Sequence, residues 1–296
     1  MIDSKVVATC LICAVAAGCH AGANAFTDFA SIAKPGSTKI QGTTTETSYI
    51  ASTSTFLVNS TGPSSNGSGS ATIVLDSAGN PTALTISGSN SSAAFDASKG
   101  DRFGNSAAIG APGVIAAVNA SGTQEALFAD PYVSGFNFQT YGVWETGLGS
   151  GSGSAGAITV GSATPNGGVP VFGTAKFSGS AGGVYVDAAG NNYFAASGLT
   201  VDANFGNRSL SLATSGTQKI DAATAVTSSA SNLDMSGTLT YASGSSAFNG
   251  QVTTASGLTG SAVGNFYGPN AQELGGTFGV KGAGVEGYIG GFGAKQ

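Results

Sequence analysis

The side chains that most often carry catalysis are scarce in this chain and lie near its N-terminal end. The only histidine is His20, and the three cysteines are Cys10, Cys13 and Cys19. A serine or cysteine nucleophile needs a base beside it, and histidine is the usual base. Any site of that kind would therefore have to be built from the first part of the chain.

Paired carboxylates are the other common source of acid and base chemistry, because two of them at a fixed separation can hydrolyse a glycosidic bond. The candidates show no spacing typical of such a pair, and we interpret them as turn and surface residues. They are Glu145, Asp187, Asp202, Asp221, Asp234 and Glu273. The sequence therefore predicts a protein that is not an enzyme.

Metal and haem ligands are equally sparse. The pattern from Asp76 to Asn80 recurs from Asp187 to Asn191, but the further oxygen ligands that calcium requires do not follow, so both patterns predict tight turns. A protein ligand for haem would have to be Met235 or one of the eight tyrosines. We expect Met235 to face a core from a strand. No metal site is predicted, and haem stays a hypothesis with no assigned ligand.

The charge pattern argues against nucleic acid as a partner. The chain has 10 basic and 15 acidic residues, a net charge of −5. The charges are scattered, and neither a basic stripe nor an acidic tail is present. Only 8% of the residues are charged, so hydroxyl and amide groups must hydrate most of the surface.

The N-terminus has the build of a secretory signal. Lys5 precedes an apolar run over residues 6–17 that is too short to be a stable membrane span. The sequence of residues 15–19 fits a bacterial lipobox, which would make residues 1–18 the signal peptide and Cys19 the lipid attachment site. The lipid would then be the chain's only membrane contact.

A second cleavage pattern overlaps the first. An Ala-Asn-Ala site at residues 23–25 would remove residues 1–25 and release a secreted chain. Under either cleavage no free thiol remains, and His20 is removed or lies beside the lipid. Histidine-based and cysteine-based catalysis are therefore excluded.

The rest of the chain predicts an all-β protein. Apolar residues alternate with polar ones from about Ser70 onward, and helix formers lack a helical period. Longer and more regular strands begin near Phe138, where we place a domain boundary. Two Gly- and Ser-rich stretches, residues 55–70 and 147–156, are expected to be loops. The strands predicted after the boundary span residues 137–147, 170–178, 182–187, 192–206, 208–214, 233–242, 247–254, 258–267, 273–280 and 286–293.

These later strands favour a small barrel with a filled core. Many place Gly or Ala beside a larger residue, as Gly173–Phe177 does, which lets a strongly curved sheet close. Ser, Thr and Gly occur on both faces of the strands. A barrel that faces lipid needs a continuous apolar outer band instead.

Five stretches resemble one family. The most specific is the string FYGPNAQELGGTF at residues 266–278, followed by EGYIGGFGAKQ at 286–296. Residues 173–185, 199–205 and 248–250 match earlier and later barrel strands in the same order. Together they resemble the barrel of transferrin-binding protein B and related Gram-negative surface lipoproteins.

The resemblance implies a β-rich handle domain over residues 27–137 and an antiparallel eight-stranded barrel over residues 138–296. It also implies an outer-membrane surface lipoprotein that binds a macromolecular or haem ligand. Export by a surface-lipoprotein assembly modulator, and cooperation with a TonB-dependent receptor in iron or haem acquisition, are implied as well. Transferrin-binding protein B has two such lobes and this chain has length for one, so transferrin capture is not carried over with the fold.

Two other functions fit the same sequence. One is a secreted haemophore, which would bind haem through a tyrosine or without a protein ligand. The other is a self-associating structural or adhesive surface protein, which the low charge density would suit. The ligand-binding residues stay unassigned. Tyr132, Phe136 and Tyr193 are candidates for exposed anchors, although most aromatic residues are expected to fill the core.

Overall fold

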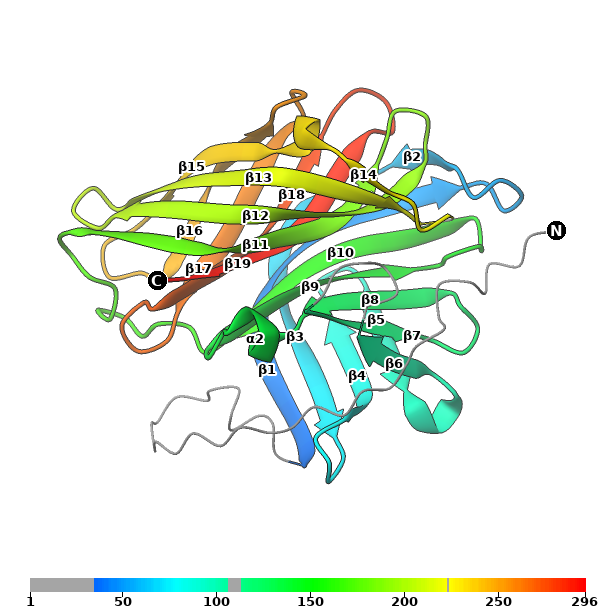
Figure 1. The fold of residues 1–296 in the computed structure, drawn as a ribbon, viewed down its shortest axis with the longest axis horizontal. Helices are drawn as coiled ribbons and strands as arrows, with labels where there is room; N and C mark the ends of the chain where they lie inside the picture. Colours follow the sequence, from blue (N-terminus) through cyan, green and yellow to red (C-terminus); the bar gives the residue numbers. More distant parts are fainter. Residues whose placement is uncertain (1–34, 106–112, 223) are drawn as a thin grey trace.

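The computed structural model describes residues 35–105, 113–222 and 224–296, and these residues form two curved antiparallel sheets (Figure 1). The N-terminal sheet has ten strands in the order β5-β4-β3-β1-β10-β9-β8-β7-β6, with β2 paired to β1. Its strands are β1 (Gly36–Ala51), β2 (Val58–Thr61), β3 (Ser65–Leu75), β4 (Pro81–Ser87), β5 (Ser92–Asp96), β6 (Arg102–Asn105), β7 (Val114–Val118), β8 (Gln124–Ala129), β9 (Gln139–Thr146) and β10 (Ser152–Gly161). The all-β prediction is confirmed.

The second sheet closes into the predicted eight-stranded barrel, because β12 pairs with both β11 and β13. The short strand β14 (Thr227–Ser229) pairs beside β13 and leads to the 3-10 turn η4 (Ser231–Leu233). The barrel strands are β11 (Thr174–Val186), β12 (Asn192–Asn204), β13 (Ser209–Asp221), β15 (Met235–Tyr241), β16 (Ala247–Thr254), β17 (Thr259–Tyr267), β18 (Glu273–Lys281) and β19 (Gly287–Lys295).

Aromatic side chains fill the barrel core around Phe266. The rings of Phe177, Phe205, Tyr241 and Phe248 lie within 5.2–6.3 Å of the Phe266 ring, centroid to centroid. Phe266 itself is fully buried. Burial of such rings is the main stabilising term for a barrel of this size.

The change from one sheet to the other falls between Gly161 and Thr174, later than the boundary expected at residue 138. The sequence placed the strand near 137–147 in the barrel, but β9 and β10 pair with β8 and β1 of the N-terminal sheet. That pairing joins β1 to a strand far along the chain, which local alternation of apolar residues cannot report.

Three local expectations also change. The runs predicted at 170–178 and 182–187 are one strand, β11, because Gly182 and Gly183 continue its ladder. The stretch at 55–70 holds β2 and the start of β3 instead of being all loop, and β10 begins within the stretch at 147–156. Long-range pairing here overrides the weak strand propensity of Gly and Ser.

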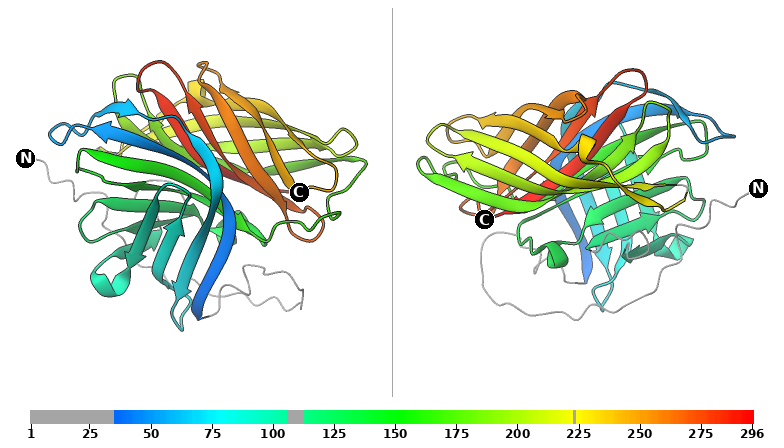
Figure 2. Two further views of the ribbon diagram at one scale, coloured as in Figure 1. Left: turned by 180° about the vertical axis from the view of Figure 1, so that it is seen from behind. Right: turned by 45° about the horizontal axis from the view of Figure 1, so that its top comes forward.

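A close-packed interface joins the two sheets, with β1, β9 and β10 lying on β18 and β19 (Figure 2). Glycines on the outer face of the barrel make this close approach possible. A Cβ on Gly293 or Gly275 would collide with the amide of Gln139, and one on Gly279 would collide with Ser64. Polar contacts cross the same interface, including a 2.7 Å hydrogen bond between the hydroxyls of Thr45 and Thr277.

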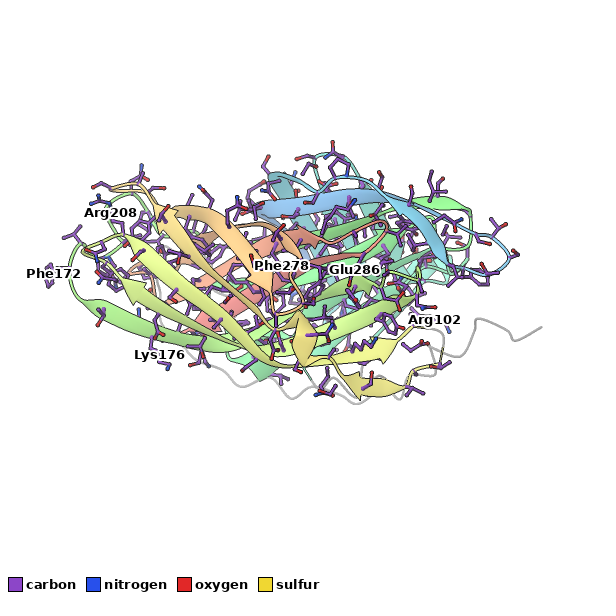
Figure 3. The ribbon with its side chains drawn as sticks, turned by 90° about the horizontal axis from the view of Figure 1, so that it is seen from above. Arg102, Phe172, Lys176, Arg208, Phe278 and Glu286 are labelled. Atoms are coloured by element: carbon purple, nitrogen blue, oxygen red, sulfur yellow. The ribbon has the colours of Figure 1, made fainter. Side chains whose placement is uncertain are left out.

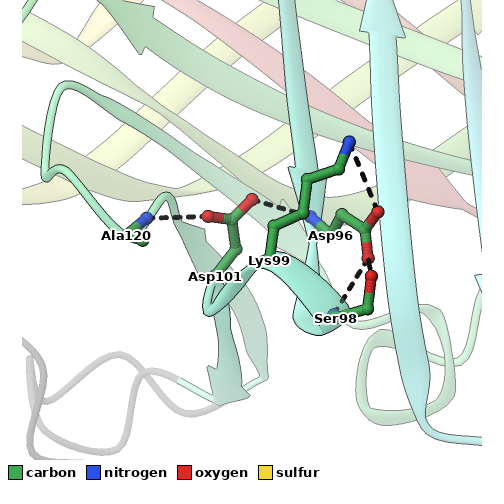
Figure 4. A network of polar contacts seen from close by, with 5 residues as sticks. All are labelled: Asp96, Ser98, Lys99, Asp101 and Ala120. Atoms are coloured by element: carbon green, nitrogen blue, oxygen red, sulfur yellow. Dashed lines mark hydrogen bonds and ion pairs between the residues drawn. The ribbon is translucent and has the colours of Figure 1, made fainter.

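The two edge strands of the N-terminal sheet, β5 and β6, are tied by a short polar network (Figure 4). Asp96 caps the 3-10 turn η2 (Ala97–Lys99) by accepting from the Ser98 N–H at 2.9 Å. Asp101 accepts from the N–H groups of Asp96 and Ala120, each at 2.7 Å. This network holds together the place where the sheet stops short of closing. In the described part of the chain, no helix has the length and apolarity to cross a membrane.

Candidate functional site

The two ends of the molecule carry different candidate binding features. At one end lies the segment from β10 to β11, residues 162–173, which we call the apical loop. Its tip exposes two large apolar side chains, Val171 at 72% and Phe172 at 82%. Figure 3 shows Phe172 projecting from this end, with Arg208 and Lys176 on the same part of the molecule. Two adjacent exposed apolar residues are a feature of interaction sites, whereas single ones are common on any surface.

The apical loop is anchored before and after its tip. Thr164 donates its hydroxyl to the Gly268 carbonyl at 2.8 Å, and the Gly268 N–H donates to Ser162 at 2.9 Å. Val169, two residues before the tip, is buried in the barrel core. Directly after the tip, the Gly173 carbonyl accepts from the Phe205 N–H at 3.0 Å. The tip is therefore held on a fixed base.

The family-like string at residues 266–278 supplies much of that base. After its turn, the Gln272 amide oxygen accepts from the Asn270 N–H at 2.9 Å. The Glu273 carboxylate then accepts from the N–H groups of Asn137 at 2.6 Å and Phe138 at 3.0 Å. One string thus fastens both the apical loop and the entry to β9, which explains why it is longer than a simple hairpin requires.

Glu273 corrects one sequence expectation. It was expected at the surface, but it is 2% exposed. Burial raises its pKa above the usual value, while the N–H donors of Asn137 and Phe138 oppose that rise. Buried backbone donors need an acceptor, so the carboxylate has a structural role here.

At the opposite end, hairpin turns from both sheets surround a cavity of about 830 Å³, which we call the basal pocket. Its walls include Tyr49 and Leu148 from the N-terminal sheet and Val186 and Ile289 from the barrel. Phe56 also lines it, is 59% exposed and has a positive φ of 60°. The volume falls within the range of small-molecule sites.

Two carboxyl groups meet in the wall of the basal pocket. Glu125 on β8 and Glu145 on β9 are direct partners across the ladder. Glu145 is 3% exposed and Glu125 is half-buried. The Asn192 amide donates to both Glu145 oxygens, at 3.2 and 3.4 Å. Burial raises the pKa of both carboxyls, and the neighbouring Glu125 charge raises that of Glu145 further. Together they retain a proton at a pH where isolated carboxyls have lost theirs.

The sequence of the barrel matches one known protein family. The family described as the C-lobe and N-lobe β-barrels of transferrin-binding protein B matches residues 169–296. The barrel is transferrin-binding protein B-like. Curated proteins gave no match.

Several solved structures are similar to this transferrin-binding protein B-like chain at low sequence identity. A transferrin-binding protein B mutant from Haemophilus parasuis is 14% identical, with 89% of this chain and 76% of that chain covered and a TM-score of 0.44. The isotype 1 protein from serogroup B Neisseria meningitidis is 17% identical, with 86% and 43% covered and a TM-score of 0.41. A surface lipoprotein is 13% identical, with 86% and 98% covered and a TM-score of 0.42.

In the transferrin-binding protein B-like barrel, the other candidate carboxylates hold turns or lie on the surface. Asp187, Asp221 and Asp234 accept from backbone N–H groups of nearby turns, as expected of turn residues. Asp202 is exposed on β12. Glu145 was expected at the surface with them, and its burial beside Glu125 corrects that expectation.

The turn predictions at Asp76 and Asp187 are confirmed. The Asp76 carboxylate accepts from the N–H groups of Ala78 and Asn80, and Asp187 repeats this with Ala189 and Asn191. Over residues 35–105, 113–222 and 224–296, three metal-ligating side chains never gather in one place.

The candidate haem ligand Met235 and the three candidate aromatic anchors lie in different surroundings. Met235 lies in the barrel core, as predicted. Of the three candidate anchors, Tyr132 is 57% exposed and Phe136 is buried. Tyr193 is half-buried, stacked on Tyr185, with the Lys219 ammonium 3.9 Å from its ring centroid. Tyr132 is on the short helix α2 (Pro131–Ser134).

The Cys19 lipid site and both signal cleavage sites lie outside the described residues.

Sequence reasoning missed Phe172 and Glu125. Pro170 and Gly173 bracket the apolar pair at the loop tip, and that bracket could have marked a turn where a strand was predicted. Glu125 alternates with Ala126 and Phe128 on a strand, so its position on the opposite face could be read. Its pairing with Glu145 depends on the strand register and could not be read from the sequence.

Proposed function

We propose that this chain is an exported, non-enzymatic protein that captures a macromolecular ligand through its apical loop. The observation that carries the proposal is the exposure of Val171 and Phe172 on an anchored base. An aromatic side chain at the centre of an interface often supplies much of the binding energy. Because both flanks of the tip are fixed, little conformational entropy is lost when a partner orders it.

The ligand class follows from the family. The matched barrel model is named for transferrin-binding protein B, so we propose an iron-carrying or haem-carrying protein as the partner. A protein ligand suits an exposed apolar tip, whereas free haem bound there would need an axial ligand, and residues 162–173 contain no His, Cys, Met or Tyr. Met235 is buried in the core and does not offer that ligand.

We further propose that the lobe is held on the outer membrane surface by a lipid on Cys19. Export by a surface-lipoprotein assembly modulator and delivery of the cargo to a TonB-dependent receptor complete the proposal. Globomycin treatment of cells that express the full chain tests the anchor, because it blocks lipoprotein signal cleavage. The expected result is that globomycin makes the uncleaved form accumulate, whereas the processing of Cys19→Ala does not respond to globomycin. Processing of the wild type that ignores globomycin would contradict the lipid anchor.

A pull-down tests the capture proposal. Immobilised residues 20–296 are exposed to serum and to haem-protein mixtures, and retained proteins are identified by mass spectrometry. The double variant Val171→Ser/Phe172→Ser should lose a retained iron or haem carrier. The control Ile50→Ser/Val226→Ser removes two other exposed apolar side chains, 55% and 62% exposed, from near the basal pocket and should retain the carrier. Equal retention by both double variants would overturn the proposal.

A further inference from the structure

The basal pocket is built from two rows of residues, one on each sheet. Hydrogen-bonded partners across the N-terminal sheet place one row in register: Arg102, Val118, Glu125, Glu145, Ala155 and Thr47. Partners across the barrel place a second row in register: Asn192, Val186, Gly287 and Lys281. Every member of both rows lines the pocket. Direct partners project from the same face of a sheet, so the rows face a common cavity.

Most of the remaining wall is apolar. Tyr49, Val58 and Val186 form one buried cluster there, and Val184 and Ile289 belong to a second. Phe56 adds an exposed ring on the same wall. A wall of this kind takes the apolar body of a ligand, and a few polar groups then fix its orientation.

The polar groups that face the carboxyl pair come from several elements. Asn192 donates to Glu145, as described above. The Tyr49 hydroxyl donates to the Thr146 carbonyl at 2.8 Å, and the Lys281 ammonium donates to the Thr61 carbonyl at 2.9 Å. The other charged or titratable groups of the wall are Arg102, Asp221 and Tyr288. Among the described residues that shift the pKa of Glu125 or Glu145, no basic side chain is found.

We propose that the basal pocket binds a small organic cation with an apolar body, whose ammonium or amidinium group is seated on Glu125 and Glu145. A metal ion suits the site less well, because a third carboxylate, histidine or cysteine does not join the pair within the described residues. An organic cation satisfies both the acceptor oxygens and the apolar wall. This site is at the far end from the apical loop and is independent of the proposed capture function.

Binding of the cation displaces the proton that the two carboxyls share. Before binding, the carboxyl pair of the protein carries one proton. When the ammonium ion binds, both carboxyls are ionised in the complex, and the displaced proton passes to the buffer. Atoms and charge balance without a further reactant. Affinity should therefore rise with pH until the amine itself begins to lose its proton.

Isothermal titration calorimetry of residues 20–296 at pH 7.5 tests the site with two probes. 4-Phenylbutylamine carries the cation, and 4-phenylbutanol is its uncharged counterpart. We expect the amine to bind at least tenfold more tightly than the alcohol. Titration in two buffers of different ionisation enthalpy should show release of up to one proton per amine. Equal affinities for the two probes, or no binding of the amine up to its solubility limit, would overturn the proposal.

Variants locate the site. Glu125→Gln/Glu145→Gln should weaken amine binding at least tenfold and abolish proton release, with alcohol binding unchanged. Asp202→Asn removes an exposed carboxylate on the outer barrel surface and should bind the amine as the wild type does. Unchanged amine binding by the double Gln variant would place the amine elsewhere and overturn the proposal. The comparison of amine and alcohol on the wild type needs no variant, so a folding defect would not remove the test.

Discussion

The two ends of the molecule show how one pair of sheets can present opposite surfaces. At the apical end the sheets are pressed together through glycines, and the connecting loop projects apolar side chains outward. At the basal end the hairpin turns spread around a cavity, and two carboxyls are drawn inward. A convex apolar tip suits a protein surface, while a recessed mixed wall suits a small molecule. The loops at the two ends of one lobe can therefore serve different ligands.

The largest expected effect comes from Glu273, which fastens the apical end. Glu273→Ala leaves the N–H groups of Asn137 and Phe138 without their acceptor in a buried place. Loss of charge-assisted hydrogen bonds of this kind costs about 2–3 kcal/mol, or roughly 5–10 °C in Tm for a chain of this length. Differential scanning calorimetry measures the change.

Glu273→Gln is the matched control, since its amide oxygen still accepts one hydrogen bond, and it should lose about half as much stability. Amine binding in the basal pocket should be unaffected by either variant. A Tm of Glu273→Ala equal to that of the wild type would show that this contact does not hold the two sheets together.

A pair of glycine substitutions compares the spacing of the sheets at the two ends. A Cβ on Gly293 would collide with the Gln139 amide, whereas one on Gly287, which lines the basal pocket, would be 3.6 Å from its nearest neighbour, the Val280 carbonyl oxygen. Gly293→Ala should therefore destabilise the protein by about 1–3 kcal/mol, the usual cost of overpacking. Gly287→Ala should stay within about 0.5 kcal/mol. Urea unfolding of the two variants checks this, and equal effects would contradict the difference in spacing.

The carboxyl pair predicts a pH dependence confined to the basal end. Folding raises the pKa of Glu125 to about 7. The stability that comes from holding this proton is present below the unfolded value, about 4.3, and is lost as the pH rises through about 7. Glu145→Gln removes the second negative charge, so its Tm should fall less between pH 5 and pH 8.5 than that of the wild type, by about 2–4 °C. Asp202→Asn should follow the wild-type profile, and a Glu145→Gln profile parallel to the wild type would contradict the paired titration.

The smallest expected effect on stability is at the apical tip. Val171→Ser/Phe172→Ser changes two exposed side chains, so the free energy of unfolding should stay within about 0.5 kcal/mol of the wild type. Partner affinity should nevertheless fall more than tenfold, because an exposed aromatic anchor contributes to binding and not to folding. Chemical unfolding and biolayer interferometry on the same samples separate the two effects. A large loss of stability would mean that the tip belongs to the core.

The sequence was sufficient for the barrel and insufficient for both candidate sites. In the string at 266–278, Leu274 and Phe278 alternate with small residues such as Gly275 and face the barrel core, a pattern that can be read locally. The placement of β9 and β10 beside β1 could not be read, because it depends on pairing between distant segments. For the same reason Glu145 was taken as a surface residue, since only the register with β8 brings Glu125 opposite it. The exposure of Phe172 depends on how Val169 and Gly173 are fixed, which is also a tertiary property.

Amide hydrogen exchange on the lobe, alone and with its captured protein partner, tests the central claim most directly. The account predicts slower exchange at the apical end, in residues 169–173 and in the adjoining turn at 205–208. Exchange in the basal turns at 120–123 and 148–151 should stay unchanged. Protection confined to the basal turns, with the apical loop exchanging as in the free lobe, would contradict it.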